Sequence, residues 1–235
     1  MTIAQTDIAP KYELVVFDWD GTVMDTTALI ALGIQHAAKE MGYTVPTYEA
    51  ALSVIGLDWR SALLKVVPDC PESLHLRFNE IYRAWYIPHE AEVILFPGMR
   101  ELITGLKTIG CRTAVATGKS REGLRRVFAA TGLEPFFDTT QTASECLPKP
   151  NADMLEMCGI ETGVPAARTV MIGDTTHDVL MARRYGCDSA AMCCGASSLE
   201  DLQKSEPTVI CRNVKELSDF LGVPGLVKDV DFSAH

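Results

Sequence analysis

The sequence predicts an α/β fold, in which a Rossmann-like parallel sheet is flanked by helices and carries an inserted all-helical cap. From residue 97 onward, short apolar runs alternate with helical patterns, as in βαβ units around a parallel sheet. Residues 26–96 contain helical patterns and no convincing strand. The first apolar run, 13–17, precedes that helical stretch. We therefore expect a core of residues 1–25 and 97–235 and a cap of residues 26–96.

The strands of the core are predicted from apolar runs that stop at glycine or at polar residues. They are 13–17, 111–116, 136–138, 169–172, 189–193 and 208–211. The core helices are predicted from apolar residues at helical spacing, with Gly132 and Gly186 as two of the stop signals. They are 97–107, 121–131, 151–158, 178–185 and 214–221.

The cap is predicted to contain four helices. Thr26 or Thr27 can cap the first, which ends at Gly42, and Asp58 can cap the third, which runs to about residue 67. The second runs from 47 to about 56, and a long amphipathic pattern covers 72–90.

Composition excludes several classes of function. The chain has 235 residues, of which 47% are apolar and 22% charged, and these values are ordinary for a globular protein. A net charge of −10 argues against nucleic acid and anionic membranes as partners. No run of 18 apolar residues occurs, so no membrane span is predicted. The N-terminus lacks the basic and apolar regions of a signal peptide, which favours a cytoplasmic protein.

The eight cysteines show neither a Cys-x-x-Cys pair nor zinc-finger spacing with histidine. Several lie in apolar surroundings, where a free cysteine acts as a small hydrophobe. We therefore expect reduced, structural cysteines, as in the cytosol. A redox role for the Cys193–Cys194 pair is the less favoured alternative.

Three of the predicted strands end in polar clusters. The residues at these ends are Asp18 with Asp20, Thr117, and Asp174 with Asp178. Lys149 lies in a loop between two prolines. Since the carboxyl ends of parallel strands share one edge, these groups are expected to converge. Carboxylates suit Mg²⁺, while a hydroxyl, backbone amides and a lysine suit a phosphate, and together they predict phosphoryl-transfer chemistry.

Four motifs in order make the chain resemble the haloacid dehalogenase superfamily. Asp18-Trp19-Asp20-Gly21-Thr22-Val23 resembles its first motif, and Gly173-Asp174-Thr175-Thr176-His177-Asp178 resembles its fourth. Thr117 and Lys149 match the second and third. The match covers nearly the whole chain and is most similar to phosphoglycolate-phosphatase-like members, whose helical cap follows the first motif.

The resemblance implies a role for each motif residue. Asp18 would be the nucleophile that forms an aspartyl-phosphate, and Asp20 the acid and base. Mg²⁺ would be held by Asp18, the backbone carbonyl of Asp20 and Asp174. Asp178 would either bind the metal or orient a ligand, and as a plain alternative it would only cap its helix.

Substrate-binding residues are implied in the same way. Thr117 and the amides of Gly118 and Lys119 would bind the phosphate, and Lys149 would hold Asp18 and the phosphoryl group together. Arg60 follows a cap segment that reaches substrate in relatives, although an ordinary surface arginine is an equal alternative.

The leading hypothesis is a Mg²⁺-dependent phosphatase acting on a small phosphomonoester, phosphoglycolate-like or a sugar phosphate. A phosphomutase of the β-phosphoglucomutase type is the alternative, since it uses the same acidic pair. A binding protein on an inactive scaffold is a third reading. The expected partner is a small phosphorylated metabolite, and the protein would be a monomer or homodimer.

Overall fold

The computed structural model describes residues 10–90 and 93–231. Its centre is a six-stranded sheet with the order β3-β2-β1-β4-β5-β6, and every pair of neighbouring strands is parallel. The strands are β1 Leu14–Phe17, β2 Arg112–Thr117, β3 Thr139–Thr142, β4 Thr169–Gly173, β5 Asp188–Met192 and β6 Val209–Cys211. The predicted α/β class with a parallel sheet is confirmed.

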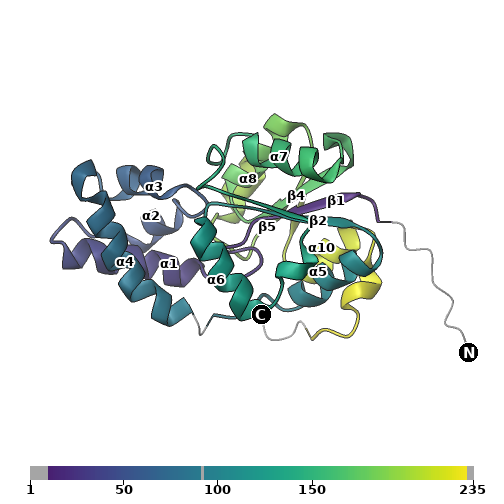
Figure 1. The fold of residues 1–235 in the computed structure, drawn as a ribbon, viewed down its shortest axis with the longest axis horizontal. Helices are drawn as coiled ribbons and strands as arrows, with labels where there is room; N and C mark the ends of the chain where they lie inside the picture. The colour runs from purple at the N-terminus through teal and green to yellow at the C-terminus, as the bar shows by residue number, and fades with distance from the viewer. Residues whose placement is uncertain (1–9, 91–92, 232–235) are drawn as a thin grey trace, which may run out of the picture.

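Helices cover both faces of the sheet and form a separate group beside it (Figure 1). The cap helices are α1 Thr27–Glu40, α2 Tyr48–Leu52, α3 Trp59–Val66 and α4 His75–Glu90. The core helices are α5 Met99–Thr108, α6 Arg121–Thr131, α7 Asp153–Thr162, α8 Thr176–Tyr185, α9 Leu199–Lys204 and α10 Val214–Phe220. Short 3₁₀ turns lie at Glu72–Leu74, Glu134–Phe136, Ala166–Arg168 and Pro224–Val227.

Strand β1 is fully buried and lies between β2 and β4 in the sheet. Its side chains alternate between the two faces, as the pleat of a strand requires. Val15 and Phe17 join the apolar cluster that includes α5, α6 and α10, whereas Leu14 and Val16 join the cluster with α7 and α8. The residues that follow β1 are therefore fixed at the middle of the sheet edge.

The cap has an apolar cluster of its own, formed between α1, α2, α3 and α4. The two chain segments that connect it to the core run side by side. Asp25 N–H donates to the Ile94 carbonyl at 3.1 Å, and Phe96 N–H donates to the Val23 carbonyl at 3.1 Å. This pairing supports the proposed division near residues 25 and 97.

Two local expectations were wrong. The segment 136–138 is not a strand, because Pro135 begins a 3₁₀ turn and the rings of Phe136 and Phe137 pack inward. The edge strand is instead the polar Thr139–Thr142. Thr26 precedes α1 without a side-chain capping bond, since its hydroxyl donates elsewhere. Helix α9 was not expected from the sequence.

In the described part of the chain, no helix is long and apolar enough to cross a membrane. All eight cysteines are free thiols, in line with the expected reduced state. The start of the chain, on which the expectation about a signal peptide depends, lies in residues 1–9, outside the described residues.

Candidate active site

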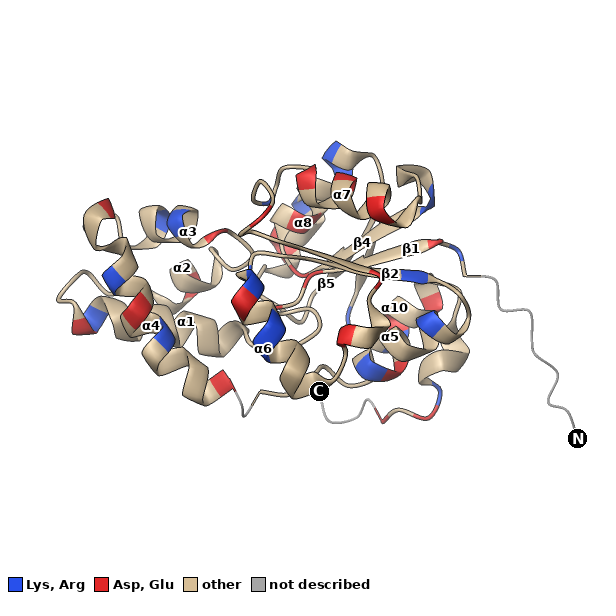
Figure 2. Ribbon diagram, in the orientation of Figure 1, with Lys and Arg blue, Asp and Glu red and all other residues tan. Residues whose placement is uncertain are grey.

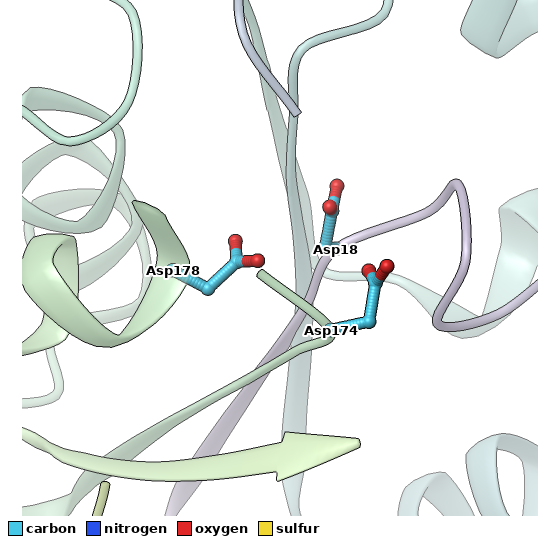
Figure 3. Close-up of side chains that lie close together, drawn as sticks. All are labelled: Asp18, Asp174 and Asp178. Atoms are coloured by element: carbon cyan, nitrogen blue, oxygen red, sulfur yellow. The ribbon is translucent and has the colours of Figure 1, made fainter. Parts of the chain in front are cut away.

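The carboxyl ends of β1, β2 and β4 bring the predicted motif residues together. Asp18 follows β1, Thr117 ends β2, and Asp174 follows β4. Asp178 lies in the first turn of α8 and points toward the same place (Figure 3). One carboxylate oxygen from each of Asp18, Asp174 and Asp178 lies within 4.8 Å of the other two. The sheet topology thus assembles three buried acids from distant parts of the chain.

Asp18 is buried and has one satisfied and one unsatisfied oxygen. Its Oδ1 accepts the backbone N–H of Trp19 at 2.7 Å and lies 2.9 Å from Lys149 Nζ. Its Oδ2 is buried and has no hydrogen-bond partner among the described residues. Burial raises the pKa of Asp18 to about 7, although Lys149 acts in the opposite direction. A buried carboxylate oxygen without a donor indicates that a cation or a substrate atom belongs beside it.

Asp174 is held in place by two donors. Thr22 Oγ1 donates to its Oδ1 at 2.8 Å, and the backbone N–H of Ala196 donates to its Oδ2 at 2.7 Å. Burial, followed by the charges of Asp18 and Asp178, raises the Asp174 pKa well above its ordinary value. Three buried acids with one lysine leave excess negative charge, which a divalent cation would neutralise.

Asp178 has partners for both of its oxygens. Lys149 Nζ lies 2.7 Å from Oδ1, while Thr175 donates to Oδ2 from its backbone N–H at 3.1 Å and from its hydroxyl at 2.6 Å. Thr175 and Asp178 also form the capping box that begins α8. Asp178 therefore does cap its helix, but capping is not its only contact, because the same side chain also pairs with Lys149.

Lys149 lies fully buried between Asp18 and Asp178. Burial acts to lower the pKa of Lys149, but the two carboxylates outweigh burial and the net pKa is raised. The ammonium is therefore charged at all physiological pH values, and it fixes the direction in which Asp18 points.

The residues present fit a small hard cation such as Mg²⁺. The donors are all carboxylate oxygens, and Asp18 also has a buried Oδ2 without a hydrogen-bond partner among the described residues. Mg²⁺ takes oxygen ligands at about 2.0–2.1 Å, so two oxygens on one ion are at most about 4 Å apart, and the three acid oxygens here lie within 4.8 Å of one another. A thiol or imidazole set for a softer metal is absent from this cluster of described residues.

Asp20 lies two residues after Asp18 and faces the cap. Thr26 Oγ1 donates to its Oδ1 at 2.7 Å, and Lys119 Nζ lies 2.7 Å from Oδ1 and 3.0 Å from Oδ2. Both contacts escaped the sequence analysis, which assigned Thr26 to a helix cap and only the amide of Lys119 to the site. Gly21, at a φ of +77°, allows the tight turn after Asp20.

The loop after β2 lies directly against the cap. The Lys119 N–H donates to Thr117 Oγ1 at 3.2 Å. A Cβ built on Gly118 would stand 2.8 Å from the Gly56 carbonyl and 2.9 Å from that of Leu57. Only glycine therefore lets the cap segment approach the loop that is expected to bind phosphate.

A pocket lies between the cap and the core, and Asp18 and Asp20 form part of its lining. It encloses about 960 Å³ of empty space, part of which is open to solvent. Thr117, Gly118 and Lys119 line the same pocket. The acids and the loop after β2 therefore face one shared cavity.

Two charged residues of the cap differ in their position. Arg60 is exposed on α3, pairs with Glu72 at 2.9 Å and does not line this pocket. Its contact with substrate stays a prediction. Glu90 was not selected in the sequence analysis, and it is buried at the end of α4, 2.5 Å from Arg126 and 3.5 Å from Lys119. Long-range packing places it there, and no local pattern could have indicated it.

Comparison with known proteins agrees with the geometry. The profile of the family described as haloacid dehalogenase-like hydrolase matches residues 15–192. "Probable phosphatase IndB" of Dickeya dadantii (strain 3937) is 31% identical over 210 residues, which are 87% of this chain and 91% of that protein. Tyrosine-protein kinase PtkA of Mycobacterium tuberculosis (strain ATCC 25618 / H37Rv) is 30% identical over 217 residues, covering 90% and 73% of the two chains.

Two further relatives are more distant. A phosphoglycolate phosphatase of Vibrio parahaemolyticus is 24% identical over 221 residues, covering 90% of this chain and 96% of that protein. The crystal structure of a hydrolase from Pseudomonas syringae superposes with a TM-score of 0.81 at 20% identity and covers 88% of this chain and 96% of that chain. The family match over most of the chain, with the acids at the ends of β1 and β4, shows that the chain belongs to the haloacid dehalogenase-like hydrolases.

Proposed function

We propose that the protein is a Mg²⁺-dependent phosphatase that hydrolyses a small phosphomonoester through an aspartyl-phosphate. The observation that carries this proposal is Asp18 itself. It is buried at the end of the central strand, is backed by Lys149 at 2.9 Å, and lines the pocket with one oxygen lacking a protein donor. A positioned carboxylate of this kind is suited to nucleophilic attack on phosphorus.

Two half-reactions follow from the positions of Asp18 and Asp20. In the first, a carboxylate oxygen of Asp18 bonds to phosphorus, the bond to the leaving oxygen breaks, and Asp20 gives that oxygen its proton. In the second, Asp20 takes a proton from water, whose oxygen attacks phosphorus and releases inorganic phosphate and Asp18. One group serves as acid and then as base.

The remaining site residues would bind and neutralise charge. Mg²⁺ would be held by the carboxylates of Asp18 and Asp174 and by the backbone carbonyl of Asp20. Asp178 would contact the ion either directly or through water. The ion would neutralise charge on the phosphoryl oxygens. Thr117 and the Gly118 and Lys119 amides would donate to those oxygens, and Lys149 would keep Asp18 aimed at phosphorus. The names of two relatives, a phosphatase and a phosphoglycolate phosphatase, support a phosphomonoester as substrate. A sugar phosphate fits the same chemistry.

The proposal is tested by measuring phosphate release from p-nitrophenyl phosphate with and without Mg²⁺. We expect release that requires Mg²⁺ and falls to a trace in Asp18→Asn, which keeps the side-chain volume. Turnover by Asp18→Asn comparable to wild type would refute the covalent role. Glucose 1-phosphate is the second substrate, since a phosphomutase would isomerise it and barely hydrolyse p-nitrophenyl phosphate.

We also expect a cytoplasmic protein whose partner is a small phosphorylated metabolite. The eight free thiols support a reducing compartment.

A further inference from the structure

The wall of the pocket opposite the catalytic acids is mainly apolar. It is supplied by cap residues, namely Ile30, Ile34, Val54, Ile55, Leu57 and Ala62. The leaving group of a phosphomonoester bound to Asp18 would project toward these side chains, because Asp20, its proton donor, faces the cap. An apolar wall favours an apolar leaving group, because binding removes apolar surface from water.

Three aromatic side chains complete the cap side of the pocket. Trp59 and Tyr82 have ring centroids 4.9 Å apart, and Tyr82 stacks on Tyr86 at 5.2 Å with 16° between the ring planes. Trp59 Nε1 is buried and has no hydrogen-bond partner among the described residues. Asn79 adds a neutral amide to the same lining. These groups can pack against a flat ring and hydrogen-bond to its edge without requiring charge.

Each cation that lines the pocket is already paired within the described structure. Lys119 lies between Asp20 and Glu90, and Arg126 pairs with the same Glu90 at 2.5 Å. Arg83 pairs with Glu122 at 2.8 Å. A second anionic group on the substrate would therefore compete with protein carboxylates for every one of these cations.

We propose that the substrate is the phosphomonoester of a neutral alcohol that carries a flat ring, and that Trp59 is a main determinant of this preference. The inference rests on the proposed function, because it places the transferring phosphoryl group at Asp18. A leaving group with its own carboxylate or phosphate is disfavoured, since burying an unpaired charge is costly.

Three esters of aliphatic alcohols with similar leaving-group acidity test the proposal. Ethyl phosphate and 2-phenylethyl phosphate differ by a ring, whereas ethyl phosphate and 2-phosphoglycolate differ by a carboxylate. Their Kd values are measured by calorimetry on Asp18→Asn with Mg²⁺, and kcat/KM is measured on wild type. We expect 2-phenylethyl phosphate to bind about tenfold or more tightly than ethyl phosphate and to have a kcat/KM higher by a similar factor. We expect 2-phosphoglycolate to bind more weakly than ethyl phosphate, and to have a lower kcat/KM, by about the same factor.

The ratio of the kcat/KM values of two esters, measured in one preparation, does not depend on the fraction of folded protein. It can therefore be compared between wild type and variants. In Trp59→Leu the ring preference should shrink to about threefold or less. Arg77→Ala is the matched control, because Arg77 lies exposed on α4 in a surface pair with Glu80. That control should keep the wild-type ratio.

The outcomes separate the inference from the proposed function. The expected binding order without any hydrolysis on wild type would support the pocket chemistry and refute the phosphatase. If the protein hydrolyses these esters and kcat/KM for 2-phosphoglycolate equals or exceeds that for ethyl phosphate, the preference for a neutral leaving group is refuted. The proposed phosphatase activity would still hold. If 2-phenylethyl phosphate neither binds more tightly nor has a higher kcat/KM than ethyl phosphate, the proposed preference for a ring is refuted.

Discussion

The ammonium of Lys119 lies 2.7 Å and 3.0 Å from the two carboxylate oxygens of Asp20. Burial acts to lower the Lys119 pKa, but the charges of Asp20 and Glu90 outweigh burial. The net pKa is raised, so the lysine stays charged. Since Thr26 donates to the same carboxylate, the general acid of the proposed reaction is fixed from both the core and the linker to the cap. Lys119 is thus a positioning residue for Asp20.

Replacing Lys119 by methionine should slow the cleavage of alkyl phosphates more than that of p-nitrophenyl phosphate. The nitrophenolate leaves without help from an acid, whereas an alkoxide needs the proton of Asp20. We expect kcat/KM for ethyl phosphate to fall by about 10²-fold, and for p-nitrophenyl phosphate by about tenfold or less. Equal losses on both esters would show instead that Lys119 acts on the phosphate itself.

Lys149 should be a major contributor to stability as well as to activity. Lys149→Met leaves Asp18 and Asp178 buried without their shared cation, so the free energy of unfolding should fall by about 3–5 kcal/mol. Urea denaturation without metal measures this loss. The double variant Asp18→Asn/Lys149→Met should recover part of it, because one buried charge has been removed.

The control for Lys149 is Lys215→Met, which breaks an exposed pair with Asp219 on α10. It should change the free energy of unfolding by less than about 0.5 kcal/mol. A loss in Lys149→Met no larger than in this control would contradict the account of the buried ion pairs.

The sequence predicted what depends on local pattern. Strand β1 is apolar because both of its faces are buried, and the acids that follow it mark its end, so Asp18 could be placed at the sheet edge. The order of the four motifs likewise indicated which strand ends converge. Strand β3 was misplaced because an edge strand is partly polar, and the more apolar Phe136 and Phe137 attracted the prediction.

Contacts between distant side chains could not be predicted in this way. Lys119 meets Glu90 only because the end of α4 in the cap lies against the loop after β2 in the core. Asp178 showed a capping position in the sequence, yet its bond to Lys149 spans 29 residues. Such pairings depend on the packing of whole elements, which local spacing does not encode.

Gly195 should be required for the position of Asp174. A Cβ at Gly195 would overlap Asp174 Oδ2, the oxygen that accepts the Ala196 N–H. Gly195→Ala should therefore displace this carboxylate and weaken Mg²⁺ binding by about tenfold or more, as changes to groups that orient metal ligands do. Isothermal titration calorimetry with Mg²⁺ measures the change.

The matched control is Gly42→Ala in the cap. Gly42 has a φ of +73° and no heavy atom within 4 Å of an added Cβ. Alanine there should cost stability through backbone strain while leaving the Mg²⁺ affinity unchanged. Unaltered Mg²⁺ affinity in Gly195→Ala would argue that Asp174 is not a metal ligand.

Mg²⁺ should stabilise the protein more at high pH than at low pH. Without metal, burial raises the pKa of Asp18 from 3.8 to about 7. The pKa of Asp18 is higher in the folded state than in the unfolded state. The protonated Asp18 therefore contributes fully to stability below the unfolded pKa, and this contribution is lost as the pH rises through about 7. Mg²⁺ binds the ionised carboxylates and competes with their protons, so it restores stability where the proton is lost. The increase in Tm on adding Mg²⁺ should therefore grow between about pH 5.5 and pH 8. Thermal unfolding with Mg²⁺ or a chelator measures it, and Asp18→Asn should flatten the trend. An increase that is the same at both pH values would show that Asp18 does not bind the ion.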